Sequence, residues 1–169
     1  MYCANCGTKL QTGTCTVCGA SSPVGAGRRD AVTGLALAGW WLRVGATLFD
    51  GLVLALPEFL IVWAMGNYTS TVSRLPVFAL QGFYGVYLLS RPRGQTIGNR
   101  VARTRVVSAS TGQPITVTSA FIRWFVPAVF SFVFGVGAIL ILLDSLWPLW
   151  DQRRQTLHDK IAGTIVVVV

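Results

Sequence analysis

The stretch GWWLRVGATLFDGLVL, residues 39–54, is almost continuously apolar, yet it carries Arg43 and Asp50. From Trp40 to Trp63 the chain is long enough for roughly 34 Å of helix, and a bilayer has a hydrocarbon core of about 30 Å. The tryptophans at its two ends match the aromatic belts found at membrane interfaces. The stretch therefore predicts a first transmembrane helix.

The composition extends this prediction to the whole chain. Of the 169 residues, 53% are hydrophobic and 12% are charged, whereas a soluble domain carries about 25% charged residues. A soluble protein with an unusually large core is the alternative, but its surface would need polar residues, and few lie between Leu35 and Leu89. We expect an all-α integral membrane protein, a compact bundle of about four transmembrane segments.

The net charge of +8 comes from arginines that flank the apolar segments. Between Glu58 and Asp144 there are seven arginines and no acidic residue: Arg74, Arg91, Arg93, Arg100, Arg103, Arg105 and Arg123. A basic surface can bind nucleic acid, but arginines beside apolar segments are typical of cytoplasmic loops in membrane proteins. We therefore expect the bilayer as the partner, with anionic lipid headgroups at the basic loop, and nucleic acid is disfavoured.

The four cysteines form two CxxC pairs, each followed by a glycine: Cys3, Cys6, Cys15 and Cys18. Thiolates at this spacing can bind one tetrahedral metal ion, and the glycines let backbone amides turn toward sulfur. We predict one structural Zn²⁺, although iron also suits four sulfurs and redox-active thiols are a further alternative. The first thirty residues are polar, so we expect no secretory signal and reduced cysteines.

The chain is expected to divide into three parts: a zinc ribbon at residues 1–20, a flexible linker of small residues at 21–34, and a transmembrane domain at 35–169. The cysteine stretch looks like the short zinc ribbons that begin many bacterial membrane proteins. A ribbon this short cannot bury a core, so the metal would supply most of its folding energy. Four sulfurs leave no open position for water, which disfavours zinc catalysis. We therefore expect the ribbon to have a binding or tethering role, with a protein partner.

The arginines also predict the topology. Arg28, Arg29 and Arg43 lie at the leading end of the first span, which favours a cytoplasmic N-terminus in a multi-pass protein of the cell (inner) membrane. A second span is expected from about Leu75 to Ser90, before two further arginines.

A small β-element is expected at the cytoplasmic surface. Residues 94–103, GQTIGNRVAR, fit an amphipathic surface helix, and residues 104–119 alternate like a β-hairpin that turns at Thr111-Gly112. The terminal TIVVVV is rich in β-branched residues and could pair with Val106-Val107. Three strands are therefore predicted.

The region from Ala120 to Trp150 has two interpretations. One long helix would leave Arg153, Arg154 and Lys160 on the outer side, against the distribution of positive charge in membrane proteins. A helical hairpin that bends at residues 135–137 returns the chain to the cytoplasm, and we prefer it. Each arm is short for a full crossing, so a locally thin bilayer or a re-entrant path is implied.

Three blocks resemble the RDD family of bacterial and archaeal membrane proteins: AGWWLRVGATLFDGLVL, GQTIGNR and RRQTLHDKIAGTIVV. The resemblance runs from Ala38 to Val169 and implies that Arg43, Asp50 and Asp159 are the arginine and two aspartates that name the family. Asn99 stands where the family often has lysine. The family is described as of unknown function; the resemblance implies transport of an unidentified ligand, and cation/proton antiport is proposed for some members.

Asp50 is the main candidate for an intramembrane polar site. A carboxylate at this depth costs about 2.5 to 3.5 kcal/mol, so it should have a partner. In a functional interpretation Asp50 titrates or binds a ligand, with Arg43 as its counter-charge. In a structural interpretation the charges hold the helices together, and Asp159 accepts from Arg43 or from an arginine of the basic loop.

Weaker candidates are Glu58, Asp144 and His158. A proton-relay role for His158 is conceivable, but a lone histidine in a basic turn is more often a capping or lipid-facing residue. No histidine lies near a free nucleophile in the sequence, so we expect no enzyme. We predict transport of an ion or small solute through the helical bundle, as a homo-oligomer. The alternative is a non-transporting interaction or scaffold protein whose zinc ribbon and basic surface recruit a protein or anionic lipid.

Overall fold

The computed structural model describes residues 28–66, 71–132 and 136–169. The predicted zinc ribbon at residues 1–20, and the linker up to residue 27, lie outside the described residues. The described part is mostly helical with one two-stranded sheet. Its elements are α1 (Trp40–Ala64), α2 (Thr71–Leu89), α3 (Ile97–Val101), β1 (Thr104–Ser108), α4 (Val117–Phe132), α5 (Gly137–Leu146), the 3-10 turn η1 (Trp147–Leu149), α6 (Leu157–Ala162) and β2 (Thr164–Val168).

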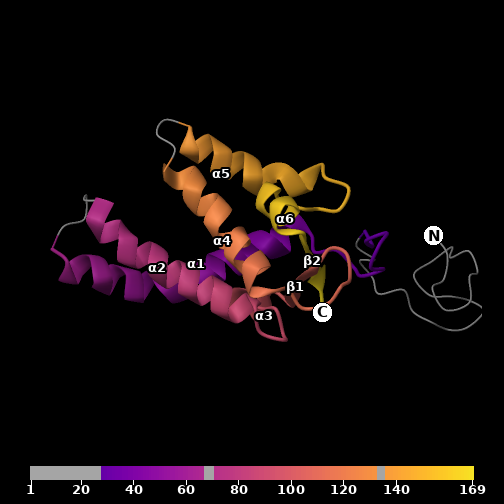
Figure 1. Ribbon diagram of the computed structural model, residues 1–169, viewed down its shortest axis with the longest axis horizontal. Helices are drawn as coiled ribbons and strands as arrows, with labels where there is room; N and C mark the ends of the chain where they lie inside the picture. Colours follow the sequence, from indigo (N-terminus) through magenta and orange to yellow (C-terminus); the bar gives the residue numbers. More distant parts are fainter. Residues whose placement is uncertain (1–27, 67–70, 133–135) are drawn as a thin grey trace, which may run out of the picture.

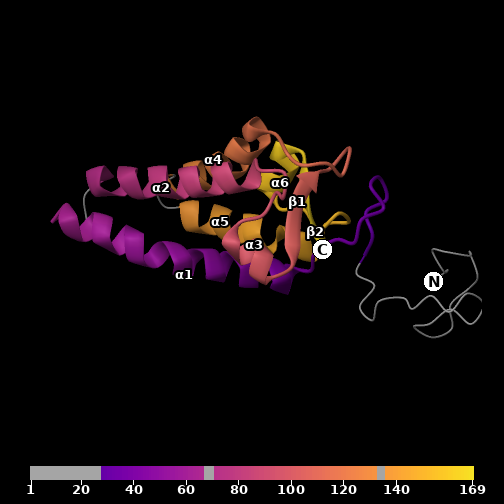
Figure 2. The ribbon, with the colours of Figure 1, turned by 90° about the horizontal axis from the view of Figure 1, so that it is seen from below.

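The four longer helices form a bundle with one elaborated end. In both views α1 and α2 run side by side, and α4 packs against α2 and α5 (Figures 1 and 2). The two strands, α3 and α6 lie together at the end of the bundle where α1 begins and α2 ends (Figure 1). We call this the sheet end.

The predicted first span is present as α1. Within the described residues, α1 is the one helix long and apolar enough to cross a membrane by length and composition, while α4 and α5 are apolar but shorter. Large apolar side chains along α1 point outward, which suits lipid rather than water: Trp41, Leu48, Leu52, Leu56, Phe59 and Trp63. By this criterion, the prediction of about four transmembrane segments is supported for α1 alone.

The predicted strand pairing is confirmed, but the predicted hairpin is wrong. Strands β1 and β2 are antiparallel, with Val106 opposite Val166. After a turn at Gly112 the chain does not return as a strand; instead it starts α4. The Thr116 hydroxyl accepts from Ser119 N at 3.2 Å, as an N-cap residue does, so α4 begins before the expected Ala120.

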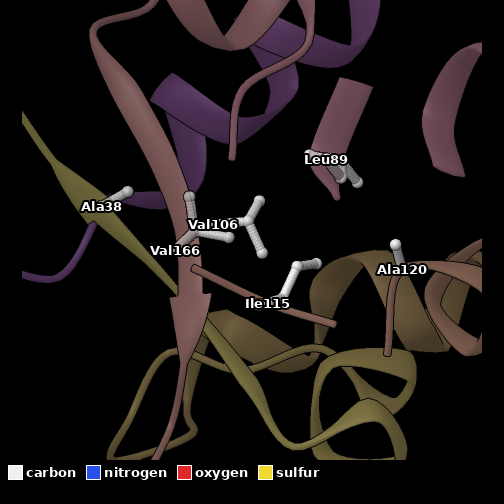
Figure 3. Close-up of a cluster of buried hydrophobic side chains, with 6 residues drawn as sticks. All are labelled: Ala38, Leu89, Val106, Ile115, Ala120 and Val166. Atoms are coloured by element: carbon white, nitrogen blue, oxygen red, sulfur yellow. The ribbon is translucent and has the colours of Figure 1, made fainter. Parts of the chain in front are cut away.

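The third partner of the sheet comes from the start of the domain. Leu37, in the segment that leads into α1, forms an isolated bridge with Val167 of β2. The core lies here, at the sheet end, where both ends of the domain meet (Figure 3). Its buried cluster draws on six separate stretches of the chain: Ala38, Leu89, Val106, Ile115, Ala120 and Val166. The buried ion cluster described below lies at this same end of the molecule.

The region from Ala120 to Trp150 contains two helices, as the hairpin interpretation predicted. Helices α4 and α5 pack against each other. Gly137, the first residue of α5, lies so close to α4 that an added Cβ would be 2.4 Å from the Phe130 carbonyl oxygen. After η1, α6 starts with a capping box, in which Thr156 and Asp159 bond each other's backbone amides.

Candidate functional site

Asp159 lies at the centre of a buried ion cluster at the sheet end. Its side chain is fully buried and binds two arginines. Arg43 Nη1 of α1 lies 2.6 Å from Oδ2, and Arg123 Nη1 of α4 contacts Oδ1. The Arg43–Asp159 contact is among the alternatives expected from the sequence. We call Arg43, Arg123 and Asp159 the clamp, because the three residues join α1, α4 and α6.

The clamp has further hydrogen bonds. Asp159 Oδ2 accepts from Thr156 N at 3.2 Å, and Arg123 Nη1 donates to Thr164 Oγ1 at 2.7 Å. Within the described residues, Arg43 Nε and Nη2 are buried without a hydrogen-bond partner. Two guanidinium groups thus share one carboxylate, and removal of that carboxylate would leave two buried cations unpaired.

Arg123 is a site residue that was not predicted from the sequence, although the sequence carries a signal for it. It is the one charged residue of α4, an otherwise apolar helix. A lone charge in such a helix needs a buried partner. The same cost of burying a charge applies to Arg123 and to Asp50.

Asp50 binds different partners from those expected. Its Oδ1 accepts from the Tyr84 hydroxyl at 2.6 Å and from Gly98 N at 2.7 Å, and its Oδ2 accepts from the Thr96 hydroxyl at 2.6 Å. In the described part of the chain no arginine pairs with Asp50. The predicted group of three therefore separates into the Arg43–Asp159 pair and an Asp50 held by neutral donors.

The GQTIGNR block explains how α3 reaches Asp50. Gly98 packs so closely on α1 that an added Cβ would lie 2.0 Å from the Ala46 carbonyl oxygen. Thr96 is the N-cap of α3: its hydroxyl accepts from Asn99 N and donates to Asp50. The block was expected to be a surface helix over residues 94–103, but its helical part is shorter and docks on α1.

A cavity of about 470 Å³ lies between α1, α2, α4 and the sheet end. We call it the central cavity. The polar groups of its wall are a carboxylate, a guanidinium, an imidazole, four hydroxyls and two amides: Asp50, Arg123, His158, Thr47, Tyr84, Thr96, Ser131, Gln81 and Asn99. Its apolar lining residues include Leu54, Phe78, Trp124, Pro127 and Ile141. A mostly apolar pocket with a few converging polar groups is the usual form of a small-molecule site.

His158 connects the cavity with Asp144. Its Nδ1 lies 2.6 Å from Asp144 Oδ2, and its backbone N donates to Asp144 Oδ1 at 2.9 Å. Its Nε2 is 3.8 Å from Asp159 Oδ1, so the histidine borders the clamp. Burial lowers the pKa of His158 below its ordinary 6.5, and the bond with Asp144 opposes this shift. Asp144 and His158, two of the three weaker candidates, therefore form a pair.

Glu58, the third weaker candidate, lies farther along α1. It accepts a hydrogen bond from Gln81 Nε2 of α2 at 2.8 Å. Gln81 lines the central cavity, whereas Glu58 is not among its lining residues. Glu58 therefore pairs α1 with α2 beside the cavity.

No group of three or more potential metal-binding side chains of histidine, cysteine, aspartate or glutamate occurs in residues 28–66, 71–132 and 136–169. Cys3, Cys6, Cys15 and Cys18 lie outside those ranges.

Comparisons with known proteins agree with the sequence blocks. The chain is 33% identical over 130 residues to the uncharacterized protein YckC of Bacillus subtilis, which is 76% of this chain and 83% of that protein. It is 38% identical over 76 residues to a proline-rich antigen homolog of Mycobacterium tuberculosis, 45% of this chain and 29% of that protein. No solved structure matches the chain significantly. The sequence profile of the RDD family matches residues 37–163, from the bridge at Leu37 to the end of α6, and the chain therefore belongs to the RDD family.

Proposed function

We propose that this protein binds an ion or small solute in the central cavity and moves it across the cell membrane. The observation that carries the proposal is the cavity of about 470 Å³, whose wall includes Asp50, Arg123 and His158. Ionisable groups inside an apolar helical domain are costly, and where they persist they commonly mark solute and ion paths.

In the proposed arrangement α1, α2, α4 and α5 all cross the bilayer, with the sheet end and the N-terminus in the cytoplasm. The apolar composition of α4 and α5 supports this, although their shortness requires a locally thin bilayer. The exposed Arg91, Arg93 and Arg100 follow α2 near the sheet end, as expected for a cytoplasmic side.

The two acidic groups have different proposed roles. Asp159 is buried and bound to two arginines, so its role is to hold α1, α4 and α6 together. Asp50 borders the cavity, and three protein donors bond its oxygens. A carboxylate has about four lone-pair sites. We assign the remaining site of Asp50 to the bound ion or solute.

The second candidate is a non-transporting scaffold protein. The observation that favours it is the set of three donors on Asp50, because these bonds alone could explain a carboxylate that joins α1, α2 and α3. In that case the zinc ribbon and the basic surface would recruit a protein or anionic lipid, and the central cavity would have no ligand of its own.

Ion flux in proteoliposomes distinguishes the transport protein from the scaffold protein. Parent protein is reconstituted, and Na⁺, K⁺ and proton movement is followed with internal fluorescent indicators under imposed gradients. We expect flux in the parent and its loss in Asp50→Asn, a variant that keeps the shape but removes the charge. Glu58→Gln is the matched control, since Glu58 lies on the same helix but not on the cavity wall. A folded parent without flux would support the scaffold.

A further inference from the structure

A second apolar surface lies on the other side of Trp124. A hollow of about 490 Å³ between α2 and α4 is lined at one end by Tyr87, Ser90 and Val117. A neighbouring hollow of about 310 Å³ reaches Leu75 and is also lined by Trp124. Both hollows are lined by Ala79 and Trp124, so they adjoin each other along α2. We call the two adjoining hollows the α2/α4 groove.

A glycine shapes the floor of this groove. Gly82 lies against the Trp124 ring, and an added Cβ would be 2.8 Å from Trp124 Cε2. The indole therefore fits into α2 and forms a wall shared by the groove and the central cavity. Phe83 and Phe121, which also line the groove, are 68% and 45% exposed. Apolar side chains this exposed suit contact with lipid, as those of α1 do.

The length of the groove suits an acyl chain. From Leu75 to Ser90 the groove follows α2 for roughly 22 Å, at 1.5 Å per residue. One leaflet contributes about 15 Å of hydrocarbon to the bilayer. A lipid tail can therefore lie along the groove for its whole depth in one leaflet.

The end of the groove nearest the sheet carries unneutralised positive charge. Arg91 Cζ lies 4.3 Å from the centre of the Tyr87 ring, and Arg91 Nη2 bonds the Tyr87 hydroxyl. Arg91 and Arg93 are exposed, and among the described residues neither has a carboxylate within ion-pair distance. An apolar groove that ends at guanidinium groups without a carboxylate partner matches a molecule with an apolar tail and an anionic head.

A second copy of this chain is a poorer match for that charge. All six acidic residues of the sequence already have partners within the molecule. Those partners are Arg153 for Asp30, Tyr84 for Asp50, Gln81 for Glu58, His158 for Asp144, Lys160 for Asp151, and Arg43 for Asp159. A carboxylate side chain of a neighbouring copy would have to leave its present partner to pair with Arg91, whereas an anionic phospholipid brings a phosphate that has no such partner.

We propose that the α2/α4 groove binds one anionic phospholipid, with an acyl chain along Trp124 and Phe121 and the phosphate at Arg91 and Arg93. The site requires only that the domain sits in a bilayer. It is independent of whether the central cavity carries a solute.

Native mass spectrometry of protein released from nanodiscs tests this site. The nanodiscs contain equal amounts of phosphatidylglycerol and phosphatidylcholine, and the lipids retained on each chain are counted. We expect one phosphatidylglycerol retained in preference to phosphatidylcholine. A cationic side chain near the headgroups changes lipid binding by about fivefold, so Arg91→Gln should lower the preference by about that factor. Ala79→Phe, which fills the shared part of the groove, should reduce retention of both lipids.

The matched control is Arg74→Gln, an exposed arginine near the other end of α2, and its lipid retention should equal that of the parent. Thermal unfolding in detergent establishes that each variant is folded. Equal retention of both lipids by the parent would overturn the proposal. So would an Arg74→Gln effect as large as that of Arg91→Gln. A lipid-free dimer that Ala79→Phe splits would show instead that a second copy occupies the groove.

Discussion

Arg43 and Asp159 are 116 residues apart in the chain, and their side chains meet at 2.6 Å. The contact joins the start of the first long helix to the last helix of the domain. Arg123 binds the other oxygen of the same carboxylate. The sheet end is thus held by charge at its centre and by the apolar cluster around Val106 and Val166.

Asp159→Asn should strongly destabilise the domain. The substitution leaves Arg43 and Arg123 buried without a counter-charge, and breaking a buried ion pair costs about 3 to 5 kcal/mol. The free energy of unfolding in detergent is the measurement. Lys160→Ala is the control on the same helix: Lys160 pairs with Asp151 but is 44% exposed, so its loss should cost less than about 1 kcal/mol. Equal effects would mean that the clamp adds no stability beyond a surface pair.

Gly98→Ala should separate α3 from α1. The added methyl group would overlap the Ala46 carbonyl oxygen, and overpacking of this kind costs typically about 1 to 3 kcal/mol. Gly51→Ala is the matched control on α1, because no atom lies within 4 Å of its added Cβ. Alanine at such a helical site should stabilise by about 0.5 to 1 kcal/mol. We therefore expect Gly98→Ala to lower the free energy of unfolding and Gly51→Ala to raise it. A Gly98→Ala variant as stable as the parent would contradict the docking of α3 on α1.

The stability of the parent should fall as the pH is lowered through the titration range of histidine. Burial lowers the pKa of His158 in the folded protein below 6.5, its value in an exposed chain. The unfolded chain therefore binds the proton more readily, and His158 contributes stability above about pH 6.5 that is lost as the pH falls through its folded pKa. Unfolding at a series of pH values measures the slope.

His158→Gln is the control for this pH dependence, because glutamine has no proton to gain. Its unfolding free energy should change less between about pH 7.5 and 5.5 than that of the parent. A variant with the same slope as the parent would assign the pH dependence to another group.

The purified full chain should contain one Zn²⁺ per molecule. The four cysteines have the spacing of a tetrahedral site, and elemental analysis measures both zinc and iron. Cys6→Ser should lower the zinc content, since three thiolates bind the ion less tightly. Iron in place of zinc would change the metal but keep the site. If the parent, purified without chelator under reducing conditions, contained no metal, the predicted four-cysteine metal site would be excluded.

The parts of the fold that the sequence predicts well depend on local patterns. Helix α1 follows from one uninterrupted apolar run, and the pairing of β1 with β2 follows from β-branched residues at Val106 and Val166. The prediction of a hairpin was wrong because the alternating polar and apolar residues after Gln113 also fit a helix that begins with Thr116 as its N-cap. Local periodicity could not separate these two outcomes.

The partners of the polar groups were harder to predict. Tyr84 lies in an apolar run of α2, and nothing in its neighbours indicates that its hydroxyl binds Asp50 on another helix. Gly98 was visible in the GQTIGNR block, but its close contact with Ala46 depends on how α3 docks. Contacts between distant segments depend on tertiary packing, which a single sequence does not specify.

The clamp also has an order of assembly, because a chain is made from its N-terminus. Arg43 and Arg123 are synthesised, and enter the apolar helices, before Asp159 exists. Until α6 is made and docks, both guanidinium groups lack the carboxylate that they share in the finished fold. A chain made only as far as α5 therefore holds two guanidinium groups without the carboxylate they share in the folded domain, and the later segment that carries Asp159 supplies it.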